Sequence, residues 1–583
     1  MKKREAWQYA SIFFILGVAS YFYFHNLGTD YITLWDEVVH VNVVKNLADD
    51  CCKPKLHLTD IGIDFQDWTN NYIWVHKPLM PLFFQAFFYK IGGESLFAFR
   101  LSQAVFALMS AVALFFIARR HFGHIIAITA TSLFVFNPYV FELVKGRQFS
   151  GLHDLMFGFF GILCLDQILE ITKPINRHST SGDAPKKHYL LFGLFAGLGY
   201  LSKGGLAFLF FPALFAASVF AEKNTAPSSP TFDAKSQAGP PSLTMRGIRL
   251  LNVLYAMMIT LGVIIPEKIA LAILYPAEYY FEQKTQVLHL FKTLEYWGRP
   301  WDYFFTVYLR DMLLPYLYFP AIAGLVYVTL GFRKDKRFMV IATWVLSFVA
   351  LLSFGKSKIA NFIFAALPGL LLSCVLMFER LWREKKSAIM FSLSATVILS
   401  YIIIRFDIWH VKFYLFQQGT AVQRFLVLFY VSLLFFSLWA AHCLLKKRWS
   451  TSIVAKTAAV LSLFLILATY ARTNQLSDQK IREDDQRQQN IKLAAQAAKR
   501  QYPKNSIFIL DYQRFPKPHL YFQYWSGLDA MEIYDRQPIF VLKKILPADR
   551  PIFIVSERNI NRWDAKLVDR RSWGYLYQLN YDN

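Results

Sequence analysis

The sequence predicts a polytopic α-helical membrane protein with a small soluble α/β domain at its C-terminus. Three observations support this fold class: 55% of the 583 residues are hydrophobic, 17% are aromatic, and long apolar runs recur up to about residue 470. A soluble protein of this length needs many more polar residues to cover several domains. Repeated Phe and Tyr side chains fit contact with lipid and with the membrane interface.

The apolar runs are long enough to cross a membrane many times. A spanning helix needs about 20 mostly apolar residues. By this measure we expect 13 spans, at 6–25, 96–118, 122–141, 151–170, 188–202, 204–221, 250–275, 308–331, 338–354, 359–378, 387–405, 425–446 and 452–470. The first span is interpreted as an uncleaved helix rather than a signal peptide, because no small-residue cleavage site follows it.

Basic residues gather in alternate loops between these spans. They form the clusters "MKKR", "ARRH", "RKDKR", "ERLWREKK" and "KKRW". The positive-inside rule places these loops, and the N-terminus, in the cytoplasm. The net charge of +23 is then explained without nucleic acid, which we do not expect as a partner. The Ser- and Pro-rich stretch at 222–249 is predicted to be a flexible cytoplasmic loop.

The opposite side of the membrane receives the first loop, residues 26–95, and the polar tail, residues 471–583. The tail begins with a Gln-rich helical stretch and continues into the strand-like runs "SIFILDY" and "PIFIVSE". This pattern predicts a small α/β domain after a membrane domain at 1–470. An odd number of spans places the tail outside the cytoplasm. Cys51 and Cys52 in the first outer loop could there form a disulfide.

The first outer loop carries an adjacent acidic pair, Asp36 and Glu37, in "YITLWDEVVH", with His40 just after it. Carboxylates beside a membrane need water or a partner, so the pair is either a reactive group or part of a structural ion pair. Further along, "HKPLMPL" places His76 and Lys77 before an apolar segment with Pro in its first turn. Lys77 either extends to the membrane interface or binds a lipid phosphate.

Other polar residues fall at the same outer ends of the spans. They are Arg100, Asp154, Lys203, Arg299, Tyr303 and Lys358. Each alone could be an interfacial anchor, and Asp154 could form a helix-end ion pair with Lys145 or Arg147. Carboxylates and cations gathered at one depth suit an anionic lipid headgroup and a reaction that needs a base.

The order of the motifs resembles that of the polytopic GT-C glycosyltransferases, the superfamily of the protein O-mannosyltransferases and the lipid A aminoarabinose transferases. The motifs in this chain are "WDEVVH", "HKPLMPLFFQ", "FAFRL", "GLGYLSKGG", "GRPWDYF" and "KSKIANFIFAALPGLLL". They cover most of residues 1–380. The layout of 13 spans and an outer C-terminal domain is similar to that of the aminoarabinose branch.

The resemblance implies an inverting glycosyltransferase at the outer face of the bacterial inner membrane. Such enzymes pass a sugar from an undecaprenyl-type polyprenyl phosphate to an envelope acceptor. Asp36 matches the family's catalytic carboxylate, and Glu37 either holds Asp36 or binds a sugar hydroxyl. Lys77 and Lys203 match basic residues near the donor phosphate, and Arg299 lies in the loop that covers the donor. These cations can neutralise the departing phosphate, so we expect no cofactor and no metal ion.

The chain departs from the family pattern at a few positions. Leu79 replaces a Pro, Ser202 a Thr and Phe362 a Tyr, and "GRPWDYF" lacks a His. These differences bear on the acceptor more than on the chemistry. The 13-span layout and the outer tail favour lipid A or a related glycolipid, and a protein hydroxyl or another envelope glycan is the alternative. A lipid or sugar transporter is the alternative of another class. It would need polar residues at mid-membrane or paired repeats, whereas the charges here favour the helix ends.

Overall fold

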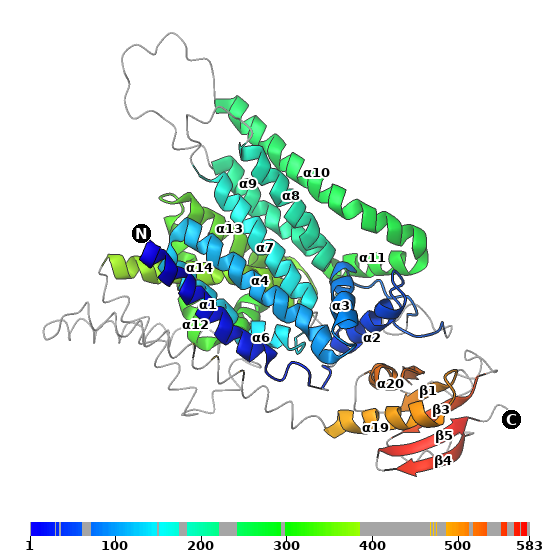
Figure 1. Cartoon of the computed structure of the whole chain (residues 1–583). Helices are drawn as coiled ribbons and strands as arrows, with labels where there is room; N and C mark the ends of the chain where they lie inside the picture. Colours follow the sequence, from blue (N-terminus) through cyan, green and yellow to red (C-terminus); the bar gives the residue numbers. More distant parts are fainter. Residues whose placement is uncertain are drawn as a thin grey trace, which may run out of the picture.

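The computed structural model describes a bundle of long helices with a small α/β unit at one end (Figure 1). The described residues are 2–29, 31–33, 36–60, 71–148, 151–173, 184–220, 242–292, 298–384, 467, 470, 474, 486–511, 517–532, 550–556, 565–571 and 573–579. The predicted spans at 387–405 and 425–446, and nearly all of that at 452–470, lie outside them. The predicted flexible loop at 222–249 is described only from residue 242 onward.

The N-terminal third of the chain supplies the helices that carry the acidic motif. In order they are α1 (Lys2–Phe24), α2 (Asp36–Asp49), α3 (Met80–Ile91) and α4 (Leu96–Phe122). The side chain of Ser95 caps α4 by accepting a hydrogen bond from the N–H of Ala98 at 3.2 Å. In the loop after α2, Cys51 and Cys52 are exposed free thiols with Sγ atoms 3.1 Å apart.

The middle of the chain returns repeatedly through the bundle. Its helices are α5 (His124–Val135), α6 (Pro138–Val144), α7 (Leu152–Ile171), α8 (Ala184–Lys203), η1 (Gly204–Phe210) and α9 (Phe211–Phe220). The axes of α5 and α6 differ by 55°, at the position of Asn137 and Pro138. Gly204 adopts a φ of +67°, which ends α8 with little strain for a glycine. The following helix, η1, packs against α8, and the ring of Phe210 in η1 lies next to Gly199 of α8.

The remaining helices complete the bundle. They are α10 (Ser242–Leu274), α11 (Pro276–Phe291), η3 (Phe304–Tyr308), α12 (Leu309–Gly331), α13 (Lys336–Phe354), η4 (Ala360–Ala366) and α14 (Leu367–Arg383). Aromatic stacking ties them to the middle helices: the rings of Phe210 and Trp344 are 4.9 Å apart and nearly parallel, and Phe157 stacks on Phe210 at 5.1 Å. The largest hydrophobic core therefore joins α7, η1 and α13.

The described helices fit a multi-pass membrane protein. Five of them are long and apolar enough to cross a bilayer: Leu96–Phe122, Lys186–Phe220, Leu250–Leu274, Lys336–Phe354 and Asn361–Arg383. Two bent pairs, His124–Val135 with Pro138–Val144 and Phe304–Leu313 with Leu317–Gly331, raise this number to seven if each pair is one span. The 35-residue stretch Lys186–Phe220 counts as one span by this test, where the sequence predicts two. The predicted first span corresponds to the shorter apolar helix Tyr9–Phe24.

The predicted strands of the tail are present in a five-stranded mixed sheet. Its elements are α19 (Gln486–Gln501), β1 (Ile507–Asp511), α20 (Pro518–Ser526), β2 (Asp529–Glu532), β3 (Ile552–Ser556), β4 (Ala565–Arg571) and β5 (Gly574–Leu579). The strand order is β2-β1-β3-β5-β4, with β1 parallel to β2 and β3, and β5 antiparallel to β3 and β4. β1 and β3 coincide with the runs "SIFILDY" and "PIFIVSE".

The α/β unit packs against the first outer loop rather than standing alone. Figure 1 shows α20 beside α2, and a second hydrophobic core contains residues of α2 together with residues of α20 and β1. Buried hydrogen bonds join the same two parts: the Asn42 amide donates to the Leu520 carbonyl at 2.9 Å, and the Gln523 amide donates to the Leu56 carbonyl at 2.6 Å. The chain segment with the acidic pair is therefore covered by the C-terminal unit.

Helix α12 approaches α14 closely enough that only glycine fits at residue 324. A methyl group there would lie 2.6 Å from the backbone N and Cα of Cys374. Gly324→Ala is expected to lower the free energy of unfolding by about 1–3 kcal/mol, because the two backbones must separate. The matched control is Gly262→Ala in α10, where nothing lies within 4 Å. Thermal unfolding in detergent checks this, and equal melting temperatures for the two variants would contradict the close packing.

Candidate functional site

Asp36 begins α2 and forms an ion pair with Lys77. The Lys77 ammonium lies 2.5 Å from a carboxylate oxygen of Asp36, and the side chains are 19% and 13% exposed. A carboxylate in the first turn of a helix is favoured by the helix dipole. Lys77 stands just before α3, whose first turn contains Pro81. The structure thus brings together the predicted base and the predicted phosphate ligand from motifs 41 residues apart.

Glu37 has a different partner. Its carboxylate receives two hydrogen bonds from the Arg100 guanidinium, at 2.7 and 3.1 Å, and a third from the Thr33 N–H at 2.6 Å. The two side chains are only 3% and 2% exposed. Gly146, with a φ of +72°, lies so close to the Glu37 carboxylate that a Cβ atom would overlap it. The carboxylate of Glu37 is therefore buried and hydrogen-bonded to Arg100 and Thr33. Its role differs from that of Asp36, which pairs with Lys77.

Arg100 also fixes the backbone that precedes the acidic pair. Its guanidinium donates to the carbonyls of Leu27 and Thr29, both at 3.0 Å, and to the carbonyl of Tyr31. This buried cation thus holds the strap, which we define as residues 27–29 and 31–33, and the carboxylate of Glu37 at once. Bidentate pairing of a guanidinium with a carboxylate is among the strongest hydrogen-bonded contacts in proteins.

A second ion pair is formed by Asp154 and Lys203. Asp154 lies in the first turn of α7 and Lys203 is the last residue of α8, and both side chains are buried. The Asn361 amide donates to the other Asp154 oxygen at 3.0 Å. The alternative partners Lys145 and Arg147 lie elsewhere: Lys145 donates to the His25 carbonyl, and Arg147 contacts Glu142 at 3.5 Å. Asp154 is thus part of the Lys203 group.

Buried histidines lie beside the two ion pairs. The rings of His40 and His153 are 4.7 Å apart, and Trp74 packs edge-on against His40 at 5.5 Å. Burial lowers the pKa of His40 to about 3, and the positive charge of Lys77 adds to this shift. His40 is therefore neutral at physiological pH. His76 points to another helix, with its Nδ1 atom 2.6 Å from Glu282 of α11.

Arg299, Tyr303 and Lys358 form a neighbouring group. Arg299 and Lys358 line a pocket of 440 Å³ together with Lys356 and Trp301, while the Tyr303 ring lies 5.7 Å from the Arg299 guanidinium. The Lys358 ammonium donates to the Gly355 carbonyl at 2.6 Å. Burial lowers the pKa of Lys358, and the nearby charge of Lys356 lowers it further.

The helix η4 connects this pocket to the ion pairs. Asn361 of η4 binds Asp154, and the ring of Phe362 lies 5.8 Å from the Lys203 ammonium. Phe362, which the sequence places where the family pattern has Tyr, lies beside Lys203, the predicted phosphate ligand. The predicted site residues thus fall into two adjoining groups, one around Asp36, Lys77 and Lys203 and one around Arg299.

Asn361 and Glu282 are site residues that the motifs of the sequence do not predict. Asn361 is inside the quoted motif "KSKIANF", so the motif located the segment, but an uncharged amide gave no electrostatic signal. Glu282 lies in α11, and only the fold shows that it meets His76. Sequence spacing alone cannot reveal a partner that is 206 residues away.

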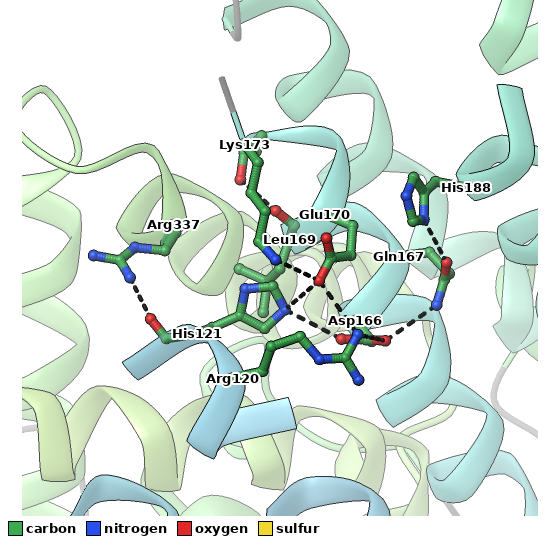
Figure 2. A network of polar contacts seen from close by, with 10 residues as sticks. Arg120, His121, Asp166, Gln167, Leu169, Glu170, Lys173, His188 and Arg337 are labelled. Atoms are coloured by element: carbon green, nitrogen blue, oxygen red, sulfur yellow. Dashed lines mark hydrogen bonds and ion pairs between the residues drawn. The ribbon is translucent and has the colours of Figure 1, made fainter. Parts of the chain in front are cut away.

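A separate polar cluster lies at the other end of α4 and α7 (Figure 2). Its members are His121, Asp166 and Glu170, whose side-chain donor atoms all lie within 4.8 Å of one another. Along α4, the 21 residues from Arg100 to His121 correspond to about 31 Å. Arg120 lies 3.4 Å from Asp166, and Lys173 lies 2.7 Å from Glu170.

The donor types in this cluster suit a divalent cation. However, each carboxylate already has a cationic partner, and the charges of the two carboxylates, Arg120 and Lys173 sum to zero. The geometry therefore indicates an ion-pair network that joins the ends of α4 and α7.

The fold and the grouped charges define a polytopic α-helical membrane protein with ion pairs gathered at the ends of its helices. The family model "Dolichyl-phosphate-mannose-protein mannosyltransferase" matches residues 76–230. This segment contains Lys77, Arg100, Asp154 and Lys203. A search of curated proteins gave no match.

Solved structures give a more particular similarity. ArnT from Cupriavidus metallidurans bound to undecaprenyl phosphate aligns with a TM-score of 0.60 at 13% identity, covering 98% of both chains. Its apo state aligns equally well over 97% of both. The apo oligosaccharyltransferase of Archaeoglobus fulgidus aligns with a TM-score of 0.50 at 12% identity, covering 94% of this chain and 69% of that one. The predicted resemblance is thus confirmed for the fold, and the family model supports it over residues 76–230.

Removing Arg100 tests the buried pair. Arg100→Met leaves the Glu37 carboxylate buried without its cation, which is expected to cost about 3–5 kcal/mol of unfolding free energy. The matched control is Arg120→Met in the same helix, where the arginine is 48% exposed. Exposed pairs contribute about 0–1 kcal/mol. Thermal unfolding of both variants in detergent measures the two losses of stability. Similar losses would show that the Arg100–Glu37 pair contributes no more to stability than the exposed arginine does.

The neutral His40 predicts a pH dependence of stability. Because the pKa of His40 is about 3 in the folded protein and near 6.5 when unfolded, the unfolded chain binds the extra proton between these values. The contribution of His40 to the free energy of unfolding is therefore complete above pH 6.5, and it decreases as the pH falls toward 3. Between pH 6.5 and 5, the wild type should lose at most about 2 kcal/mol more than His40→Gln. Parallel pH profiles in thermal unfolding would exclude this contribution.

Proposed function

We propose that the protein is an inverting glycosyltransferase that moves a sugar from a polyprenyl phosphate to an acceptor in the bacterial cell envelope. The observation that carries this proposal is the pairing of Asp36 with Lys77 beside the Asp154–Lys203 pair. A carboxylate and two lysines at the ends of helices provide a base and a phosphate site within one cluster. The similarity to ArnT bound to undecaprenyl phosphate supports a donor of this kind.

In the proposed reaction, Asp36 takes the proton of the acceptor hydroxyl, or orients an acceptor that is already anionic. The acceptor oxygen attacks the anomeric carbon, and the bond from that carbon to the phosphate oxygen breaks. The electron pair leaves with the phosphate, and the anomeric configuration inverts. Lys77 and Lys203 stabilise the charge that develops on the phosphate. The lysines replace part of their pairing with Asp36 and Asp154 by contacts to phosphate oxygens.

The remaining site residues take supporting roles in this proposal. Glu37 and Arg100 hold the strap and α2 in place, since their polar groups are occupied by each other and by backbone. The pocket with Arg299, Tyr303 and Lys358 receives a polar part of the donor or the acceptor. No metal or other cofactor is assigned, because the lysines supply the positive charge that the departing phosphate needs.

Lipid A or a related glycolipid is the acceptor that we favour. The support is the layout that the sequence predicts, 13 spans followed by an outer C-terminal domain. A protein hydroxyl is the alternative acceptor, and the family model that matches residues 76–230 is that of a protein mannosyltransferase. We place the N-terminus in the cytoplasm and the C-terminal domain, residues 471–583, in the periplasm, with 1–470 as the membrane domain. The support is the position of Arg120 in the last turn of α4 and of Lys173 just after α7, as expected for cytoplasmic helix ends, whereas Arg100 and Asp154 lie at the beginnings of the same helices.

Substitution of Asp36 tests the chemical role. In purified protein supplied with a polyprenyl-phosphate sugar, Asp36→Asn should lower the turnover number by about 10²–10⁴-fold, because a general base is lost. The control is Asp50→Asn in the same loop, where the aspartate pairs with Lys55 near the surface. Wild-type turnover in Asp36→Asn would exclude Asp36 as the base. Failure of the wild type to consume the donor while it moves the intact lipid between leaflets would favour a transporter.

Substitution of Lys77 tests the donor site. Lys77→Ala should raise the donor KM and lower turnover, because the phosphate loses a cation near the breaking bond. Lys90→Ala serves as the control, since Lys90 in α3 is half exposed and pairs with Glu94 and Asp49. The measurement is donor consumption over a range of donor concentrations. An unchanged donor dependence in Lys77→Ala would remove Lys77 from the phosphate site.

A further inference from the structure

The strap is also held from the side of the C-terminal domain. Gln488 of α19 pairs with both backbone groups of Ile32: its amide nitrogen donates to the carbonyl at 2.7 Å, and its amide oxygen accepts from the N–H at 3.1 Å. The Tyr521 hydroxyl of α20 donates to the same carbonyl, and the Gln488 amide also lies 3.2 Å from that hydroxyl. Ile32, Gln488 and Tyr521 are all buried.

Three successive residues of the strap are therefore fixed from two directions. Arg100 binds the carbonyl of Tyr31, and the N–H of Thr33 donates to Glu37, both from the membrane side. Ile32 between them is bound only by C-terminal residues in these contacts. Because an amide that pairs with both the N–H and the C=O of one residue fixes the peptide units on either side of it, Gln488 sets the orientation of the backbone at Ile32, four positions before Asp36.

Helix α20 holds the other side of α2 as well. The Asn42 amide donates to the Leu520 carbonyl at 2.9 Å, and the Lys45 ammonium donates to the Tyr524 carbonyl at 3.0 Å. The α/β unit thus contacts both the approach to α2 and the helix itself. Asp36, at the start of α2, is positioned between these two sets of contacts.

We propose that Gln488 and Tyr521 are positioning residues for the Asp36 carboxylate, so that the C-terminal domain completes the reaction site from outside the membrane. This inference rests on the proposed function. Neither residue touches the Asp36–Lys77 pair in the contacts described above; both act through Ile32 and the start of α2. A displacement of about 1 Å at a reacting group can reduce turnover by about 100-fold, so loss of these hydrogen bonds acts on turnover rather than on donor binding.

Two nearly isosteric variants test the proposal. Gln488→Glu keeps the oxygen that accepts from Ile32 N–H but turns the donor that faces the carbonyl into a second acceptor. Tyr521→Phe removes only the hydroxyl. The matched control is Arg550→Gln, because Arg550 donates to Thr59 at 2.8 Å and to Asp529 at 2.7 Å and so joins the same two parts away from Ile32.

The full-length protein is assayed with a polyprenyl-phosphate sugar and acceptor lipid. Gln488→Glu and Tyr521→Phe should lower kcat by about 10–100-fold with the donor KM changed less than about twofold. Arg550→Gln should keep kcat within about twofold of the wild type. Equal losses in all three variants, or losses that follow the melting temperature alone, would mean that the contacts serve only stability, and unchanged kcat in the first two would overturn the proposal.

Hydrogen–deuterium exchange separates this proposal from the proposed function. The N–H groups of the strap should exchange faster in Gln488→Glu than in the wild type and in Arg550→Gln, because the Ile32 N–H partner and its orientation are perturbed. Inactive wild-type protein would overturn the glycosyltransferase assignment and with it the link to kcat. Unchanged exchange in Gln488→Glu together with normal kcat would overturn the positioning role while leaving that assignment intact.

Discussion

The buried pair of Arg100 and Glu37 is the contact on which the rest of the site depends. One guanidinium binds a carboxylate through two hydrogen bonds and takes backbone carbonyls of the strap with its remaining N–H groups. Removing a cation and a carboxylate from water is costly, and only such complete pairing compensates for it. Because Glu37 belongs to α2 and Arg100 to α4, the pair fixes the position of α2 relative to α4. Because Asp36 is the residue next to Glu37, the neighbouring carboxylate is left at the edge of the buried region, where it meets Lys77.

The two neighbouring ion pairs, Asp36–Lys77 and Asp154–Lys203, have the same arrangement. Each lysine lies at the end or beginning of a helix and faces an aspartate in the first turn of another helix. Each aspartate has favourable helix-dipole contacts, and each lysine has long, adjustable reach. Between them the histidines add polar surface without charge, because burial keeps His40 neutral. In the proposed reaction, the phosphodiester of the donor carries one negative charge, as does each carboxylate that now pairs with a lysine, and the phosphate gains a second negative charge when its bond to the sugar breaks.

Much of this arrangement could be predicted from the sequence, and the remainder depended on long-range contacts. The motif order located Asp36, Lys77 and Lys203, and the alternation of "SIFILDY" and "PIFIVSE" predicted β1 and β3. The separate role of Glu37 could not be foreseen, because its partner lies 63 residues away on α4. Arg299 was grouped with the donor lysines, whereas the structure places it in a pocket with Lys358. The hydrophobic runs predict two spans at 188–202 and 204–221, but they do not show the backbone conformation of Gly204, a φ of +67°, with which η1 begins after α8.

The contact between Gln488 and Ile32 joins residues separated by 456 positions of the chain. The ribosome adds about 5–20 residues per second, so Gln488 is synthesised tens of seconds after Ile32. During that time the helices around Asp36 can already be in the bilayer, while the strap has only its membrane-side contacts. The acidic motif thus acquires its final geometry only after α19, which carries Gln488, has been synthesised. A prematurely terminated chain would occupy the membrane without this last set of hydrogen bonds.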